Sequence, residues 1–147
     1  MISKEAHHVS AENAHEYIQG YTIVNEVSLA EESFYRPAIK AKCRDGFCPI
    51  GPSVIDAKHI KTPESLSIDT YINGELKHST NTDQLHYSIA QLIEFISSFI
   101  TLQAGDLIIT ATPPRTVELN AGDTVAIHIE GLGSLENPIV AEQELAQ

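Results

Sequence analysis

The stretch of sequence that decides the fold is residues 66–78, LSIDTYINGELKH. Positions 66, 68, 70 and 72 are Leu, Ile, Thr and Ile, and they alternate with polar or larger residues. This is the two-residue period of a β-strand with one buried face. Asn73-Gly74 follows at once, and that pair favours the positive φ angles of a type I′ turn. The pattern therefore predicts a β-hairpin that turns at residues 73 and 74.

Segments on both sides of the hairpin predict further strands and helices. Residues 88–100 carry one apolar stripe at spacings of three and four, typical of a helix, and Ser88 is a suitable N-cap. A short helix is expected at 11–19, capped by Ser10 and stopped by Gly20. Strands are expected at 21–27, 39–43, 47–55, 107–110, 124–130 and 135–140. The sequence thus predicts one strand-dominated α+β domain over residues 1–147, with one long and one or two short helices.

The motif L-x-A-G-D occurs twice, at residues 102–106 and 119–123, and each copy precedes an expected strand. The copies are too short to be repeated domains. We interpret them as the same turn used twice.

The charge distribution indicates the class of partner. The chain has 20 acidic and 9 basic residues and a net charge of −11, so its surface repels phosphate backbones and nucleic acid is not an expected partner. No apolar run approaches membrane-spanning length, so a membrane is not expected either. Arg36, Lys40, Lys42 and Arg44 nevertheless lie close together in sequence. Such a cluster suits a dicarboxylate, because Arg grips carboxylates and Lys shuttles protons, and the alternative is a solvated basic face.

The two cysteines and the N-terminus indicate the cellular compartment. Cys43 and Cys48 are too few for a disulfide framework and are a weak zinc signal, so we expect reduced, buried thiols. Residues 1–5 show no signal-peptide pattern. A cytoplasmic protein is the expectation.

Two further positions carry candidate chemistry. Glu26 lies at the end of an expected buried strand, where a carboxylate either reaches solvent or is paired or bound to a metal. Thr112 lies where the expected strand 107–110 runs into Pro113-Pro114. Its hydroxyl and the nearby N–H groups could hold a carboxylate or an oxo group, and the alternative is a plain turn.

Taken in order, seven motifs resemble the fumarylacetoacetate hydrolase family, and they cover about residues 2 to 142. The resemblance implies a mixed β-sandwich or roll. The motifs are GYT through NEVS (20–28), KC (42–43), CPIG (48–51), NGE (73–75), TLQAGD (101–106), TATP (110–113) and EGLGSLENP (130–138).

Residues 31–51 are similar to one branch of this family, the isomerase/decarboxylases of 4-hydroxyphenylacetate breakdown, and to their N-terminal half. The resemblance implies a small 2-oxo or 2-hydroxy-diene dicarboxylate as substrate. It implies decarboxylation of 5-carboxymethyl-2-oxo-hex-3-ene-1,7-dioate or isomerisation of 2-hydroxyhepta-2,4-diene-1,7-dioate. It also implies Mg²⁺ or Mn²⁺, since a divalent cation stabilises enolate charge.

Individual residues carry over from the resemblance. Glu26 stands where the family has a metal-binding carboxylate, usually Asp, and Lys42 stands at the family's catalytic lysine. Thr112 stands at the threonine of the family's T-G-T-P turn and is assigned to substrate binding. Arg36 and Arg44 are added as substrate-binding residues on charge and proximity alone.

The family's E-x-E motif, which supplies two more metal carboxylates, would lie just upstream of Ile2, before the first residue of this sequence. We therefore expect an N-terminally incomplete domain with unpaired sheet edges. Homo-oligomers, or pairing with a sister subunit of the family, would cover them. Two hypotheses follow: an enzyme subunit, or a catalytically silent subunit or truncated remnant that pairs with an intact sister domain.

Overall fold

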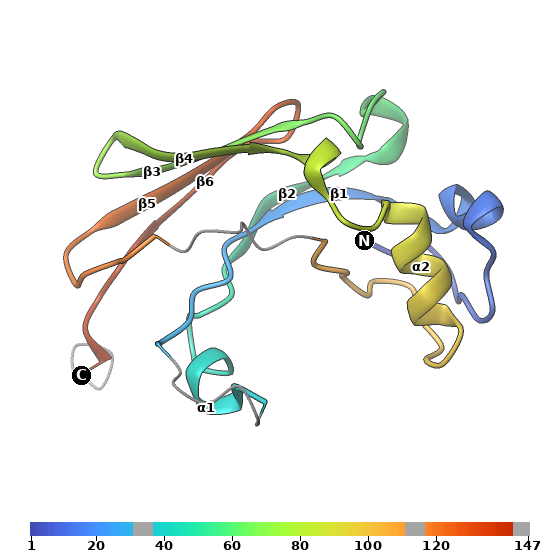
Figure 1. The fold of residues 1–147 in the computed structure, drawn as a ribbon, viewed down its shortest axis with the longest axis horizontal. Coiled ribbons are helices and arrows are strands. Elements are labelled where there is room, and N and C mark those ends of the chain that lie inside the picture. Colours follow the sequence, from blue (N-terminus) through green and yellow to red (C-terminus); the bar gives the residue numbers. More distant parts are fainter. Residues whose placement is uncertain (31–36, 111–116, 143–147) are drawn as a thin grey trace.

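The computed structural model describes residues 1–30, 37–110 and 117–142. Its strands form two antiparallel sheets: β1 pairs with β2, and a four-stranded sheet has the order β4-β3-β5-β6. In Figure 1, α2 and η1 lie together at the end of the molecule away from the turn of the β3–β4 hairpin. The strand-dominated α+β class is confirmed. The elements are η1 (Ala11–Tyr17), β1 (Gly20–Val24), α1 (Ile39–Lys42), β2 (Ile50–Asp56), η2 (Ala57–His59), β3 (Ser67–Ile72), β4 (Glu75–Asn81), η3 (Thr82–Gln84), α2 (Ile89–Ser97), β5 (Thr124–Ile129) and β6 (Gly133–Pro138), where η marks a 3₁₀-helix.

The predicted hairpin is the β3–β4 pair. Ile72 pairs with Glu75 across the turn, and Asn73 and Gly74 have φ angles of 51° and 81°, as a type I′ turn requires. The Asn73 side chain also accepts a hydrogen bond from the Thr124 amide at 2.9 Å. The turn residue therefore ties the hairpin to the start of β5.

The two L-x-A-G-D segments form the same turn, as predicted. The Asp106 carboxylate accepts a hydrogen bond from the Gln103 amide at 2.7 Å, and Asp123 accepts one from the Asn120 amide at 2.8 Å. The glycine in each copy has a left-handed φ, 95° in the first and 96° in the second. The Asn73 amide group donates a further hydrogen bond to Asp123 at 2.8 Å.

These hydrogen bonds predict a pH-dependent stability. The Asn120 backbone amide and then the Asn73 side chain lower the pKa of Asp123. A lowered folded-state pKa gives stability that is present above the unfolded value, about 3.9, and is lost as the pH falls through the folded value. We expect Asp123→Asn to reduce the acid sensitivity of the melting temperature between about pH 5 and pH 2. Asp83→Asn is the control, because the Asp83 carboxylate accepts no hydrogen bond within the described ranges. Equal acid sensitivity in Asp123→Asn and the unmutated chain would contradict this account.

Helix α2 begins at its predicted cap. The Ser88 hydroxyl accepts from the Gln91 amide at 3.2 Å, and the Gln91 side chain accepts from the Ser88 amide at 2.9 Å, which completes a capping box. The helix packs its inner face on a first core cluster. That cluster contains Ile2, Ala6, Val9, Ala14, Ile93 and Leu102, with partly buried neighbours that include Ile89, Ile96 and Ile108.

A second core cluster lies between β1 and the four-stranded sheet. It is formed by Ile23 of β1 together with Ile60, Leu66, Leu132 and Leu135. Ile23 is 1 % exposed, so β1 contributes a fully buried side chain to this cluster. None of the helices within the described ranges is long and apolar enough to span a bilayer.

Several local predictions are wrong. Residues 39–43 form not a strand but the one-turn helix α1, with Lys42 N–H donating to Ala38 O at 3.0 Å and Cys43 N–H to Ile39 O at 2.7 Å. The apolar alternation there is not that of a strand with one buried face, since Ala41 is 4 % exposed but Ile39 is 62 % exposed. Both thiols, Cys43 and Cys48, are exposed rather than buried.

Two other predicted elements also differ. Residues 107–110 are not a strand, because no neighbouring segment of the described chain pairs with them. The first helix is a 3₁₀-helix that ends at Tyr17, and Ser10 does not cap it with its side chain. Gly20 is therefore the first residue of β1 instead of a helix stop.

Gly20 is required by close packing rather than by its backbone angle. A Cβ built there would lie 2.2 Å from the Ile55 carbonyl oxygen on β2. We expect Gly20→Ala to destabilise the fold by about 2–3 kcal/mol or more in chemical denaturation, because the β1–β2 ladder must separate. Gly74→Ala, where a Cβ meets no atom but φ is +81°, isolates the backbone strain and should cost about 1 kcal/mol. A smaller loss of stability in Gly20→Ala than in Gly74→Ala would show that the β1–β2 ladder has room for a Cβ at position 20.

Candidate functional site

The predicted metal carboxylate lies on an extended segment that continues β1. Beyond Val24, the Asn25 amide donates to Pro49 O at 3.0 Å, Val27 to Phe47 O at 2.8 Å, and Leu29 to Ala41 O at 3.0 Å. The Asn25 side chain is buried, whereas Glu26, the next residue of the extended chain, is exposed. This alternation presents Glu26 on the face opposite the second core cluster.

Lys42 meets Glu26 directly. It is the last residue of α1, and its Nζ lies 3.0 Å from Glu26 Oε1. The Lys42 side chain is 44 % exposed and the Glu26 side chain 29 %, so the pair lies at the surface but is partly screened from solvent. The hydrogen bond from Leu29 to Ala41 O fixes α1 beside the 25–29 segment and so brings the two charges together.

Arg44 lies two residues beyond Lys42 but is held by other groups. Its Nε donates to Lys40 O at 2.8 Å, which orients the guanidinium at the end of α1. Its Nη1 lies 2.7 Å from Glu142 Oε1, 98 positions away along the chain. Sequence reasoning missed Glu142, because a single acidic residue so far away carries no local signal.

The structure therefore brings Glu26 and Lys42 into contact and places Arg44 just beyond the same short helical turn. Two other predicted site residues, Arg36 and Thr112, lie outside the described residues. Across the parts of the chain that are described, no group of three His, Cys, Asp or Glu side chains could hold a metal ion.

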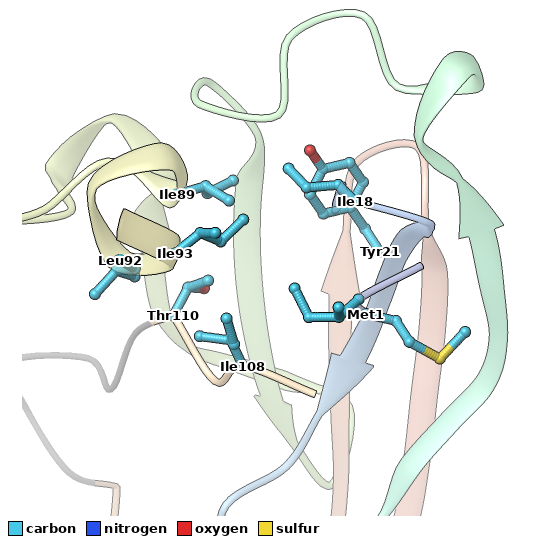
Figure 2. A pocket seen from close by; sticks show the side chains of 9 residues that line it. Met1, Ile18, Tyr21, Ile89, Leu92, Ile93, Ile108 and Thr110 are labelled. Atoms are coloured by element: carbon cyan, nitrogen blue, oxygen red, sulfur yellow. The ribbon is translucent and has the colours of Figure 1, made fainter. Parts of the chain in front are cut away.

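A separate, mostly apolar pocket of about 40 Å³ lies between α2, β1 and the chain start (Figure 2). Glu26, Lys42 and Arg44, the three predicted site residues that the structure describes, do not line it. Burial, and then the Glu64 carboxylate, raise the pKa of Tyr21 in its wall. The lining residues are Met1, Ile2, Ile18, Tyr21, Ile89, Leu92, Ile93, Ile108 and Thr110.

The fold and the motifs together define the class. The family model described as the C-terminal domain of fumarylacetoacetate (FAA) hydrolase matches residues 1–140. The chain belongs to the fumarylacetoacetate hydrolase family.

Individual relatives within this family are similar to the chain over nearly its whole length. The chain is 50 % identical over its whole length to the 4-hydroxyphenylacetate degradation bifunctional isomerase/decarboxylase of Salmonella dublin. Over 99 % of its length it is 49 % identical to the homoprotocatechuate catabolism bifunctional isomerase/decarboxylase of Escherichia coli. It spans 33 % of the length of either relative.

A solved structure gives the same picture. The 2-hydroxyhepta-2,4-diene-1,7-dioate isomerase from Mycobacterium marinum superposes with a TM-score of 0.89 at 37 % identity. The match covers 96 % of this chain and 55 % of that one. The predicted family resemblance is therefore confirmed, and so is the fold that it implied.

Proposed function

We propose that this chain is an isomerase/decarboxylase domain that acts on a small 2-oxo or 2-hydroxy-diene dicarboxylate in 4-hydroxyphenylacetate degradation. The proposal places it in the role of the N-terminal half of the bifunctional enzymes. The observation that carries it is the identity of 49–50 % to those enzymes over essentially the whole chain. The contact between Lys42 and Glu26 supports it, because it provides a partly screened proton carrier at a predicted position.

The chemistry needs a cation and a proton at one place. In decarboxylation the electron pair of the broken C–C bond becomes the enolate, and in isomerisation the 2-hydroxyl group loses its proton to solvent. Both steps leave negative charge on an enolate oxygen. The Lys42 ammonium can stabilise that charge and then donate its proton to the new carbon. Glu26 holds Nζ in position at 3.0 Å, and the exposed side of Lys42 allows solvent to return the proton.

Arg44 would bind a carboxylate of the substrate. Its guanidinium is already oriented by Lys40 O and already holds one carboxylate, that of Glu142. Glu142 is 81 % exposed, so a substrate carboxylate can replace it with little loss of packing. Arg is suited to this exchange because its planar fork matches carboxylate geometry.

The described residues do not by themselves make a site for Mg²⁺ or Mn²⁺. Mg²⁺ requires about six oxygen ligands in an octahedron. Here Glu26 is a single carboxylate, and one of its oxygens already contacts the Lys42 ammonium. The proposed chemistry therefore includes no step on a metal ion.

The same shortage of ligands supports a second candidate, a catalytically silent subunit that pairs with an intact sister domain. The two candidates are separated by assaying the purified chain with each of the two dioates, following diene absorbance and CO₂ release. Turnover above a heat-inactivated control is the expected result. No turnover, together with no Mg²⁺ or Mn²⁺ binding tighter than about 1 mM in calorimetry, would establish the silent subunit instead.

A further inference from the structure

The two cysteines lie on either side of one tight turn. Cys43 directly follows α1, Cys48 lies two residues before β2, and both are exposed. Between them Phe47 N–H donates to Arg44 O at 3.2 Å, which closes a four-residue turn over residues 44–47. The ends of such a turn lie within about 7 Å of each other. The cysteines are the residues immediately outside it, so the turn directs their Cα atoms toward the spacing of about 4.4–6.8 Å that a disulfide joins.

Both arms of this turn are hydrogen-bonded to the segment that continues β1. On the α1 arm Leu29 N–H donates to Ala41 O at 3.0 Å, and on the β2 arm Val27 N–H donates to Phe47 O at 2.8 Å. Leu29 and Val27 are two residues apart, so one segment holds the two arms a short distance from each other (Figure 1). Neither arm can move away without breaking a backbone hydrogen bond, and the two thiols therefore remain neighbours in the folded chain.

The strand register places the Cys48 side chain beside the contact between Glu26 and Lys42. Val24 pairs with Ile50 at the end of the β1–β2 ladder, and the backbone hydrogen bonds beyond that pair continue the same register. Glu26 is therefore opposite Cys48, and directly opposite residues point to the same face of a ladder. Glu26 also contacts Lys42 at 3.0 Å, and Lys42 directly precedes the other cysteine. A bridge between the two thiols would thus lie next to this ion pair.

We propose that Cys43 and Cys48 form a modification site, a dithiol that a small disulfide such as oxidised glutathione converts into one intrachain disulfide. The thiolate of one cysteine attacks the S–S bond of the reagent, forms a mixed disulfide and releases one reduced thiol. The second cysteine then attacks this mixed disulfide, closes the protein S–S bond and releases the second reduced thiol. The two protons and two electrons that the protein loses are found in the two released thiols.

The turn favours ring closure over a stable mixed disulfide. Once one thiol carries the reagent, the other is already held beside it, which gives it a high effective concentration for the second attack. The bridge would be formed by two exposed residues, and exposed disulfides are readily reduced by small thiols. The site is therefore suited to reversible oxidation rather than to a permanent structural bridge.

The test titrates the folded chain with oxidised glutathione at a fixed concentration of reduced glutathione. The sequence has only these two cysteines, so mass spectrometry of alkylated samples counts every thiol. We expect both free thiols to be lost, the mass to fall by about 2 Da with no glutathione attached, and dithiothreitol to reverse the change. Half oxidation should need at least about ten-fold less oxidised glutathione than in urea, where the two arms are not held together.

Cys43→Ser and Cys48→Ser are the matched controls, and each should stop at the mixed disulfide because the second attack has no thiol. Three results would overturn the proposal. Stable attachment of glutathione to both cysteines of the unmutated chain would show that the thiols are not neighbours. Equal midpoints in the folded chain and in urea would show that the turn does not hold them together. A disulfide-linked dimer as the main product would assign the thiols to a contact between copies. All readouts are masses and thiol counts, so they leave the proposed function untouched.

Discussion

Lys42→Ala is expected to lower turnover of both dioates by about 100-fold or more, because the change removes the proton donor of the proposed chemistry. The fold should be unaffected. Lys42 is 44 % exposed and ends a one-turn helix, and a surface ion pair contributes at most about 1 kcal/mol to stability. The measurement is the initial rate from diene absorbance, with circular dichroism melts of the same samples.

Two further variants sharpen this test. Lys58→Ala removes a lysine from another exposed ion pair, with Asp56 at 2.8 Å, and should leave turnover unchanged. Lys42→Arg keeps the charge beside Glu26 but cannot release a proton near neutral pH, so it should keep substrate binding and lose kcat. Turnover that is unchanged in Lys42→Ala would remove Lys42 from the site.

Local sequence patterns predicted the structure correctly where the hydrogen-bond partners are near neighbours in sequence. The type I′ turn at Asn73-Gly74, the capping box at Ser88 and the repeated L-x-A-G-D turn all close hydrogen bonds within a few residues. They failed for two predicted strands. Residues 107–110 have strand-forming side chains but no strand of the described chain beside them, and residues 39–43 close local hydrogen bonds as a helical turn instead of pairing as a strand.

The candidate site was also predictable only in part, because its residues carry sequence motifs but their contacts do not. Glu26 and Lys42 were predicted from motifs, and the structure adds that they contact each other. That contact depends on the hydrogen bond between Leu29 and Ala41, which no local pattern encodes. The Arg44–Glu142 pair joins residues 98 positions apart and involves ordinary surface side chains. Only the folded chain shows that the guanidinium assigned to substrate already holds a carboxylate.

Ile93→Ala should have the largest effect on stability. Ile93 is 1 % exposed on the inner face of α2 and belongs to the first core cluster with Ile2 and Leu102. Its truncation removes buried methyl groups and leaves a cavity, so we expect a loss of about 2–5 kcal/mol in the free energy of unfolding from denaturant titration. Because the cluster also contains Ile2, residues 1–3 should lose protection against hydrogen exchange at the same time.

Phe95→Ala is the matched control in the same helix. Phe95 is 66 % exposed and makes an edge contact with Phe99, so its loss in the monomer should cost less than about 1.5 kcal/mol. The comparison also tests the predicted homo-oligomer. If Phe95→Ala lowers stability as much as Ile93→Ala, and does so only above the concentration at which light scattering detects a dimer, then the exposed face of α2 is buried between copies. If its effect stays small at every concentration, the oligomer does not use this face.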